Sequence, residues 1–256
     1  MATQSLAPAL RALTAISLRE LDERAALQRR VDTKYLISRD GFERLLGALR
    51  RDHDVLDIDG RRAFGYRSVY FDTPRLRCFH EHVEGRRPRF KARTRCYLDE
   101  GACQFEVKLT TRNGETDKHG VEHPPERADR LTDEARELVD RVLADARVQP
   151  AGELSPVLAT SFDRVTLAAR EGGARMTCDL GLRLERLHGP AAALDAGLVL
   201  IETKSQDGRS RADEALARLG AEPRSMSKYR TAVDLLIERD RSGGTAPLRR
   251  HFESVG

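Results

Sequence analysis

The chain has 256 residues, of which 39% are hydrophobic and 34% are charged, so it is long enough to bury a sizeable core. A net charge of only +4 and an aromatic fraction of 5% argue against a nucleic-acid partner, which needs a dense basic surface and stacking platforms. No run approaches the ~18 apolar residues of a membrane span, and the first fifteen residues lack the features of a signal peptide. We therefore expect a cytoplasmic protein without a membrane segment.

Hydrophobic periodicity predicts the following elements in chain order. Alternation or β-rich composition predicts strands at 29–37, 53–58, 62–71, 88–98, 103–111, 115–122, 156–170, 174–186 and 194–204. Helical patterns are expected at 18–27, from Ser38 onward, and at 76–83, 132–144, 209–219 and 229–239. These elements predict an N-terminal helix or tail over 1–24, a single domain over 25–240 and a disordered tail over 241–256.

The order of these elements predicts the fold class. Many strands, a few interspersed helices and no regular strand–helix alternation favour an α+β fold with an antiparallel sheet. Strand spacing near ten residues further predicts a β-barrel. The four cysteines have no CxxC pair and no zinc-like spacing with histidine, so we expect reduced thiols packed as small apolar groups.

Charged residues recur at alternate positions of five predicted strands. Residues two apart in a strand share a face, and the opposite faces are mostly apolar. The charged faces carry Arg89, Lys91, Arg93 and Arg95; Glu106 and Lys108; Arg175 and Asp179; Glu202 and Lys204; and Asp32 and Lys34.

Two interpretations of these faces remain open. The simpler one is an ordinary sheet with one solvated face. The other is a closed sheet whose charged faces line a tunnel, with the apolar faces packed outward against helices. Neighbouring like charges repel, so a cationic bore favours a polyanion with closely spaced charges, such as a chain of phosphates. The single acids among the cations would then supply oxygen ligands for Mg²⁺ or Mn²⁺.

Lysine usage supports the tunnel interpretation. Only six of the 45 basic residues are lysines, and a compact ammonium is not interchangeable with guanidinium at a tight site. Four of the six lie on the charged strands, and Lys118 lies in the adjoining segment 115–122.

Seven short motifs occur in the order found in VTC domains, the polyphosphate-polymerase-like branch of the triphosphate tunnel metalloenzymes. They are RVDTKY (30–35), SVYFDTP (68–74), RFKARTR (89–95), FEVK (105–108), RMTCD (175–179), IETK (201–204) and SKYR (227–230). The chain resembles this family over residues 25–240. The resemblance implies an antiparallel β-barrel tunnel with a charged interior and helices outside.

The resemblance also implies roles for individual residues. The family's catalytic and phosphate-binding basic residues match Lys34, Arg93, Arg95, Lys108, Arg175 and Lys204, and its further phosphate-binding residues match Lys118, Arg164 and Lys228. The metal-binding glutamate matches Glu202, with Glu106 and Asp32 as further candidates. Asp32 stands where many relatives have Glu, which retracts the carboxylate by one methylene. Neither an SPX-like helical domain nor a transmembrane segment is recognisable in the sequence, so the resemblance does not imply coupling to membrane translocation.

The implied function is transfer of the ATP γ-phosphate to a growing polyphosphate chain with Mn²⁺ or Mg²⁺. A tripolyphosphate or nucleoside triphosphate hydrolase remains an alternative, because the same tunnel could use water as acceptor. A non-catalytic polyphosphate sensor is a third possibility, although the acids at 106 and 202 favour an enzyme. Tyr66 and Tyr70 share a predicted strand face, where we expect packing or lining.

Overall fold

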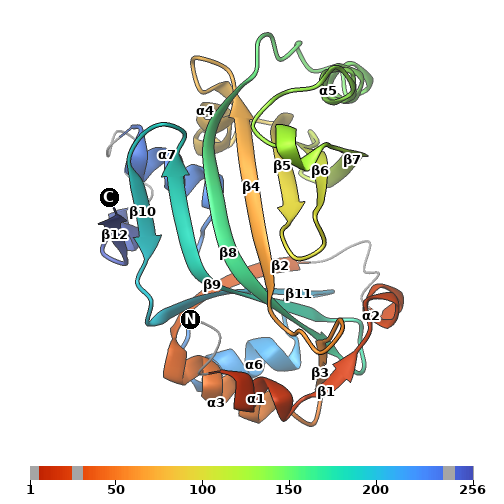
Figure 1. Cartoon of the computed structure of the whole chain (residues 1–256), viewed down its shortest axis with the longest axis vertical. Helices are drawn as coiled ribbons and strands as arrows, with labels where there is room; N and C mark the ends of the chain where they lie inside the picture. Colours follow the sequence, from red (N-terminus) through yellow and green to blue (C-terminus); the bar gives the residue numbers. More distant parts are fainter. Residues whose placement is uncertain (1–5, 25–30, 239–245, 256) are drawn as a thin grey trace. The chain divides into compact units, whose positions relative to one another are not determined.

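The computed structural model describes residues 6–24, 31–238 and 246–255 (Figure 1). The strands are β1 (Thr14–Ile16), β2 (Val31–Ser38), β3 (His53–Leu56), β4 (Phe64–Asp72), β5 (Arg89–Tyr97), β6 (Ala102–Thr110), β7 (Thr116–Glu122), β8 (Ser155–Ala169), β9 (Arg175–Arg186), β10 (Ala191–Leu194), β11 (Leu198–Ser205) and β12 (Phe252–Val255). The helices are α1 (Ala7–Arg11), α2 (Leu18–Arg24), α3 (Arg39–Leu49), α4 (Arg77–Val83), the 3₁₀ helix η1 (Pro125–Arg127), α5 (Asp133–Asp145), α6 (Arg211–Arg218), α7 (Lys228–Leu236) and α8 (Ala246–Arg249).

These elements follow the predicted ones closely, with one division that the periodicity did not show. The strand predicted over 194–204 is β10 and β11, separated by a turn in which Gly197 N donates to Asp195 Oδ1 at 2.7 Å. Residues 25–27 of the predicted second helix and residues 29–30 of the strand after it lie outside the described residues.

The predicted antiparallel α+β class is confirmed, with β1 and β3 as a parallel exception. In the described part of the chain, twelve strands form one hydrogen-bonded sheet, and eight of them follow each other in the order β12-β10-β9-β8-β4-β5-β6-β7. In addition, β11 pairs with β2 and β9, and β3 pairs with β1 and β8. This ladder branches and does not close, unlike the predicted barrel.

The branch arises because β9 shares one of its edges between two strands. Its first half, Arg175–Asp179, pairs with β11, and its second half, residues 183–185, pairs with β10. Gly181 lies between the two stretches with φ +60°, a backbone conformation that glycine adopts at little cost. The strand therefore changes partner along its length instead of completing a cylinder.

The described residues group into two compact units. Unit 1 comprises Met1–Phe64, Phe162–Leu182 and Leu194–Ser225, and unit 2 comprises Gly65–Ser161, Arg183–Ala193 and Met226–Gly256. The single domain predicted over 25–240 stays a prediction.

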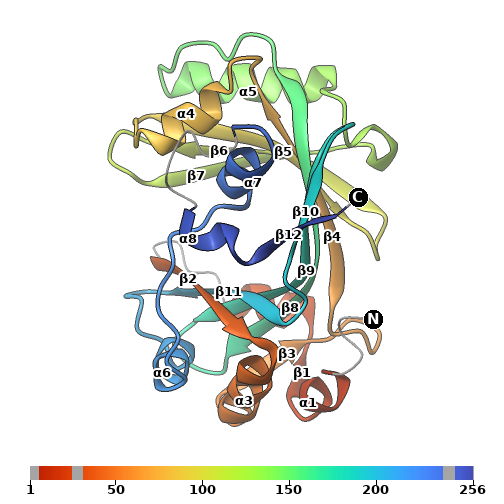
Figure 2. The ribbon, with the colours of Figure 1, turned by 90° about the vertical axis from the view of Figure 1, so that its left-hand side faces the viewer.

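The core of unit 1 lies between its strands and three helices. Apolar residues of β2 and β11 cluster with those of α1, α3 and α6, and α3 lies against α1 and α6 (Figure 2). The α3 helix begins where Ser38 Oγ accepts a hydrogen bond from Gly41 N at 3.1 Å, which satisfies one otherwise unpaired backbone donor. The predicted packing of apolar strand faces against helices is therefore confirmed in this unit.

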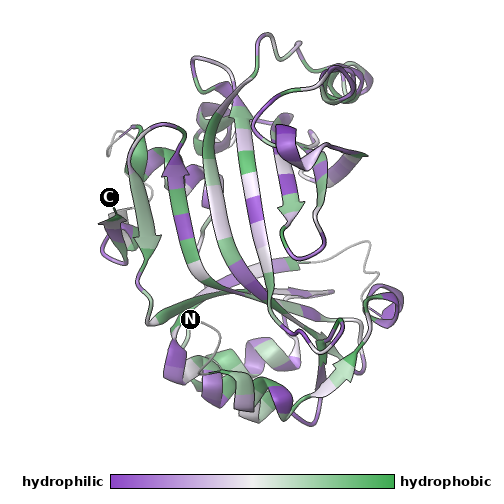
Figure 3. Ribbon diagram, in the orientation of Figure 1, coloured by the Kyte–Doolittle hydropathy of each residue, from purple (hydrophilic) through white to green (hydrophobic). Residues whose placement is uncertain are grey.

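In unit 2, β5 alternates strictly between buried apolar or small residues and partly buried residues, which are charged except for Tyr97 (Figure 3). The α5 helix packs against β6 and β7, and α4 packs against β5 and α7. The α7 helix departs from the predicted pattern, because it contacts residues of the charged face. Tyr229 stacks on Tyr70 with ring centroids 5.1 Å apart, and Lys91 Nζ donates to Ser227 Oγ at 3.1 Å.

Regular structure extends close to both ends of the described chain. Leu6, Leu10 and Leu13 are buried in the unit 1 core, and α1 and α2 lie within the segment 1–24, for which a helix or a tail was predicted. Residues 246–249 form α8 and residues 252–255 form β12, which pairs with β10, whereas disorder was predicted from residue 241 onward. Residues 239–245 and 256 of that tail lie outside the described residues. The pairing of β12 with β10, which is distant in the sequence, accounts for the strand near the C-terminal end.

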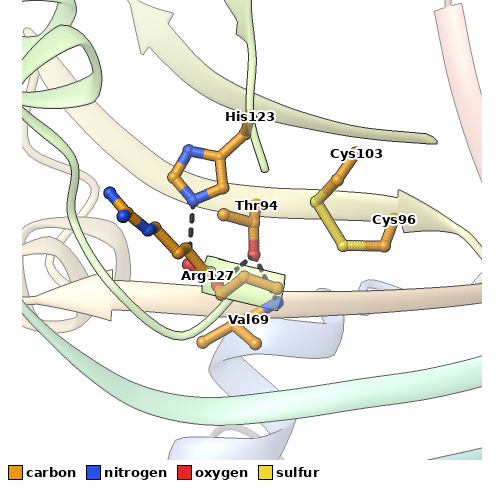
Figure 4. Close-up of a disulfide and its surroundings, with 7 residues drawn as sticks. Val69, Thr94, Cys96, Cys103, His123 and Arg127 are labelled. Atoms are coloured by element: carbon orange, nitrogen blue, oxygen red, sulfur yellow. Dashed lines mark hydrogen bonds between the residues drawn. A yellow bond between two sulfur atoms is a disulfide. The ribbon is translucent and has the colours of Figure 1, made fainter. Parts of the chain in front are cut away.

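The expectation of four reduced thiols is wrong for two of them. Cys96 and Cys103 stand opposite each other on β5 and β6 and form a disulfide (Figure 4). The hairpin register brings the two thiols together, and no CxxC spacing is required. Cys78 and Cys178 are free and buried, as expected. Among the described residues, no helix has the length and apolar character to cross a membrane.

Candidate functional site

The charged positions of β2, β11 and β9 form adjacent rows in unit 1. The register places Lys34 opposite Glu202 and Asp32 opposite Lys204. Arg175 of β9 lies on the other side of β11, opposite Lys204. Paired residues project to the same face of a sheet. The five charged side chains of these three strands, which are distant from one another in the sequence, are therefore gathered on one surface.

Glu202 is held between two lysines on this surface. Its Oε1 lies 2.6 Å from Lys204 Nζ and 3.5 Å from Lys34 Nζ. Lys204 Nζ is also 3.9 Å from Asp32 Oδ2. Burial lowers the pKa of Lys204 below its ordinary value, although Glu202 and Asp32 act in the opposite direction. The cluster thus contains two carboxylates and two ammonium groups at partly shielded positions.

Arg164 of β8 is fixed by a bidentate pair with Asp179 of β9. Its Nε lies 2.7 Å from Asp179 Oδ1 and its Nη2 lies 2.9 Å from Oδ2. The guanidinium also lies over the ring of Phe162, 5.0 Å from the centroid. Two parallel hydrogen bonds and a ring contact define the plane of the guanidinium, which suits recognition of planar or tetrahedral anions.

In unit 2, one carboxylate holds two arginines of β5. Glu106 Oε2 accepts from Arg93 Nε at 2.9 Å and lies 3.3 Å from Arg95 Nη2. Arg93 Nη1 also donates to Tyr70 Oη at 3.1 Å. Burial lowers the pKa of Arg93, but Tyr70 and Glu106 outweigh it and raise the pKa above its ordinary value. Arg93 is therefore a permanent and well-oriented cation.

Three lysines form a row across β5, β6 and β7. Lys91 lies opposite Lys108, which lies opposite Lys118. Burial, together with Lys108, Arg89 and Arg93, lowers the pKa of Lys91 to about 7, while Cys78 acts in the opposite direction. Burial, together with Lys91 and other nearby cations, also lowers the pKa of His82 to about 3. Such a concentration of positive charge favours the binding of an anion.

The start of α7 is anchored to the same face of unit 2. Tyr229 Oη donates a short hydrogen bond to the buried carboxylate of Asp72, which also accepts from the backbone N of Cys78 at 2.9 Å and of Phe79 at 3.0 Å. Burial and the charge of Asp72 raise the pKa of Tyr229, so its hydroxyl stays protonated. Lys228, the first residue of α7, follows directly after the N-cap Ser227.

The predicted site residues therefore fall into two clusters. Unit 1 carries Asp32, Lys34, Arg164, Arg175, Glu202 and Lys204, and unit 2 carries Arg93, Arg95, Glu106, Lys108, Lys118 and Lys228. Their convergence in one bore, and the roles assigned to them, stay predictions. Lys91 and Tyr70 were not predicted as site residues. Lys91 is two positions from Arg93 and Tyr70 is two positions from Asp72, so this alternate spacing could have placed each of them on the same strand face as its neighbour.

The carboxylates of unit 1 are suited to a divalent metal ion only in part. Among the described residues, no group of three or more His, Cys, Asp or Glu side chains is placed to hold a metal. Glu202 and Asp32 nevertheless share one lysine, which places two hard oxygen donors in one cluster. Mg²⁺ is commonly held by one or two carboxylates with phosphate oxygens and water completing its shell. The donor set fits that arrangement.

Comparison with protein families identifies the chain. The model of the VTC domain matches residues 29–237, which is most of the sequence. The chain belongs to the VTC domain family. The family resemblance inferred from the seven motifs is thereby confirmed.

Among the solved structures similar to this VTC domain, one with a TM-score above 0.5 agrees with the assignment of its fold. The protein described as "Putative adenylyl cyclase HpAC1 from Hippeastrum reveals a dominant triphophatase activity" is 16% identical with a TM-score of 0.51, covering 86% of this chain and 97% of that one. PH1819 from Pyrococcus horikoshii OT3 is 17% identical with a TM-score of 0.45, covering 80% of this chain and 96% of that one. No curated protein matches the sequence.

Proposed function

We propose that this VTC domain catalyses metal-dependent phosphoryl transfer on triphosphate and polyphosphate substrates, and that it transfers the γ-phosphate of ATP to a polyphosphate chain. The observation that carries the proposal is the Lys34–Glu202–Lys204 cluster, which combines compact cations with a carboxylate on one strand face. The matched family supports the polyphosphate substrate. A cytoplasmic location, where ATP is abundant, accompanies the proposal.

Phosphoryl transfer asks little covalent chemistry of a protein, because alignment and charge neutralisation supply most of the catalysis. We assign phosphate binding in unit 1 to Lys34, Lys204, Arg175 and Arg164, and in unit 2 to Arg93, Arg95, Lys108, Lys118 and Lys228. The arginines held by Asp179 and Glu106 are already oriented, so they lose little freedom when they bind an anion. The lysines supply compact charges where phosphates lie close together.

Glu202, with Asp32, would hold a divalent ion such as Mn²⁺ or Mg²⁺, which supplies further neutralisation of phosphate charge. The lysines beside these carboxylates would become available to phosphate oxygens once a metal ion was bound. Glu106 is a different case, because its Oε2 accepts from Arg93 and also lies close to Arg95. We therefore give Glu106 a positioning role toward these arginines in preference to direct metal binding.

Hydrolysis is the second candidate function, since the chain has the fold of HpAC1 from Hippeastrum, which is described as having a dominant triphosphatase activity. The same cations would hold the triphosphate, and water would replace the polyphosphate chain as acceptor. A polyphosphate sensor would use the cations alone, without turnover.

The deciding experiment incubates the purified protein with Mn²⁺ or Mg²⁺, γ-labelled ATP and a polyphosphate primer, and resolves products by chain length. Label in long chains supports the polymerase, and label found only in free phosphate supports the hydrolase. Polyphosphate binding without metal and without ADP release supports the sensor.

The Glu202→Gln variant tests the assignment of the carboxylate. We expect turnover to fall by about 10²–10³, the usual cost of one lost electrostatic contact at a reacting centre, while circular dichroism and the thermal midpoint change little. Glu137→Gln, at an exposed position of α5, is the matched control and should retain full activity. Undiminished activity of Glu202→Gln would refute the assignment.

A further inference from the structure

Two of the five tyrosines differ from the others in their surroundings. Three of them, Tyr35, Tyr70 and Tyr229, are buried. Tyr66 and Tyr97 are only half-buried. Their rings meet edge to face with centroids 5.2 Å apart and an interplanar angle of 63°. An aromatic pair thus lies partly open to solvent on the charged face of unit 2.

The register of β4 and β5 places this pair directly beside the phosphate-binding arginines. Tyr66 lies opposite Tyr97, and the next row on the same face pairs Ser68 with Arg95. The following row carries Arg93 with Tyr70 and Glu106. Successive rows of one face are about 6.6 Å apart, twice the rise per residue of a strand. The face therefore passes from aromatic to cationic over a single row.

The backbone next to both tyrosines is held in place. Gly65 N donates to Asp99 Oδ2 at 2.6 Å, and Leu98 N donates to Gly65 O at 2.9 Å. These bonds join the residue before Tyr66 to the residues after Tyr97. A Cβ at Gly65 would approach Leu98 to 3.3 Å, so the absence of a side chain there permits the close approach. The backbone that carries the aromatic pair is therefore held on both strands by these contacts.

A nucleoside triphosphate has the same order of chemical groups as this face. A flat base comes first, the ribose follows as a spacer, and the phosphates come last. Bases stack on aromatic side chains with little dependence on their identity, because every base has a π-face. Inorganic triphosphate and polyphosphate carry no group that could use an aromatic platform.

We propose that Tyr66 and Tyr97 form a nucleobase-binding site that distinguishes a nucleoside triphosphate donor from inorganic triphosphate. The inference rests on the proposed function, since it requires Arg95 and Arg93 to bind the phosphates of the same nucleotide. Tyr66 and Tyr97 act in binding and specificity, and they take no part in the phosphoryl transfer itself.

The test compares ATP with tripolyphosphate as probes, using calorimetric titration of the full chain in the presence of a chelator so that turnover does not interfere. Replacing the rings while keeping apolar bulk, as Tyr66→Leu and Tyr97→Leu, should weaken ATP binding about tenfold per ring. Tripolyphosphate binding should stay within about twofold. Tyr97→Phe keeps the ring and should bind ATP as the wild type does.

The outcomes separate this inference from the proposed function. Equal weakening of ATP and tripolyphosphate binding would show a structural pair and overturn the nucleobase site. Unchanged ATP binding in both leucine variants would overturn it as well, and thermal unfolding of each variant confirms that the comparison uses folded protein. Failure of the wild type to bind tripolyphosphate would instead overturn the proposed function, and the nucleobase site with it.

Discussion

Lys91 and Lys108 stand directly opposite each other on β5 and β6, and the ammonium group of Lys91 donates to Ser227 Oγ at 3.1 Å. Like charges placed across a strand pair destabilise a sheet. Here the cost is reduced because burial and the neighbouring cations lower the pKa of Lys91 to about 7, so that part of the population is neutral near physiological pH.

This relationship predicts how Lys91→Met alters the dependence of stability on pH. An unfolded lysine has a pKa of about 10.4, so between pH 7 and 10 the unfolded state binds more protons than the folded state, and wild-type stability rises with pH. The variant lacks this slope. We therefore expect the stability of the variant minus that of the wild type to be greatest at and below pH 7 and to decrease as the pH rises toward 10.

Urea unfolding at pH 6, 7, 8 and 9 measures this difference. The loss of the Ser227 hydrogen bond adds an offset that does not vary with pH, so the slope is diagnostic. Arg141→Met, at an exposed position of α5, serves as the control. A difference that stays constant over the whole range would contradict the lowered pKa.

Glu106→Gln should increase the affinity of the protein for tripolyphosphate when metal is absent. Glu106 now neutralises Arg93 and Arg95, and its removal leaves both guanidinium groups to the ligand. Stability should fall by about 2 kcal/mol, because charged hydrogen bonds are lost at partly buried positions. Titration calorimetry with a chelator and then with Mn²⁺ measures the effect. Weaker binding that appears only with Mn²⁺ would instead assign Glu106 to the metal.

The Cys96–Cys103 disulfide predicts the number of reactive thiols in the denatured protein. Without reductant, alkylation should modify two cysteines, Cys78 and Cys178, and after reduction all four. The Cys96→Ala/Cys103→Ala variant should lose about 2–3 kcal/mol of unfolding free energy, since the bond closes a short loop. Mass spectrometry counts the modified thiols, and four alkylated cysteines before reduction would show that the bond is not formed.

Arg164 and Asp179 should be energetically coupled. Asp179 is 2% exposed and pairs with Arg164 through two hydrogen bonds. Asp179→Asn should cost about 3 kcal/mol of stability, because it leaves a partly buried guanidinium without its countercharge. The double variant Asp179→Asn/Arg164→Met should lose less stability than the two single variants lose when their costs are added. A double-mutant cycle from urea unfolding measures the coupling, and additive effects would show that the pair contributes little.

Much of the local structure could be predicted from the sequence, as β5 and β6 illustrate. Their alternation of charged and apolar residues follows from the two-residue period of a strand, and their bounds differ from the predicted ones by only one residue. Hairpin partners are close in the sequence, so the charged faces of both strands could be foreseen. The disulfide escaped prediction because it depends on register, which strand boundaries alone do not specify.

Sequence alone therefore determined which positions carry charge and which face of each strand they occupy, because both depend on neighbouring residues and a fixed geometric period. Only the tertiary structure decided which charges meet. Lys91 reaches Ser227 across 136 positions and Tyr229 reaches Asp72 across 157, while β9 divides one edge between β10 and β11. Such contacts arise when distant segments bury apolar surface together, and no local period encodes them.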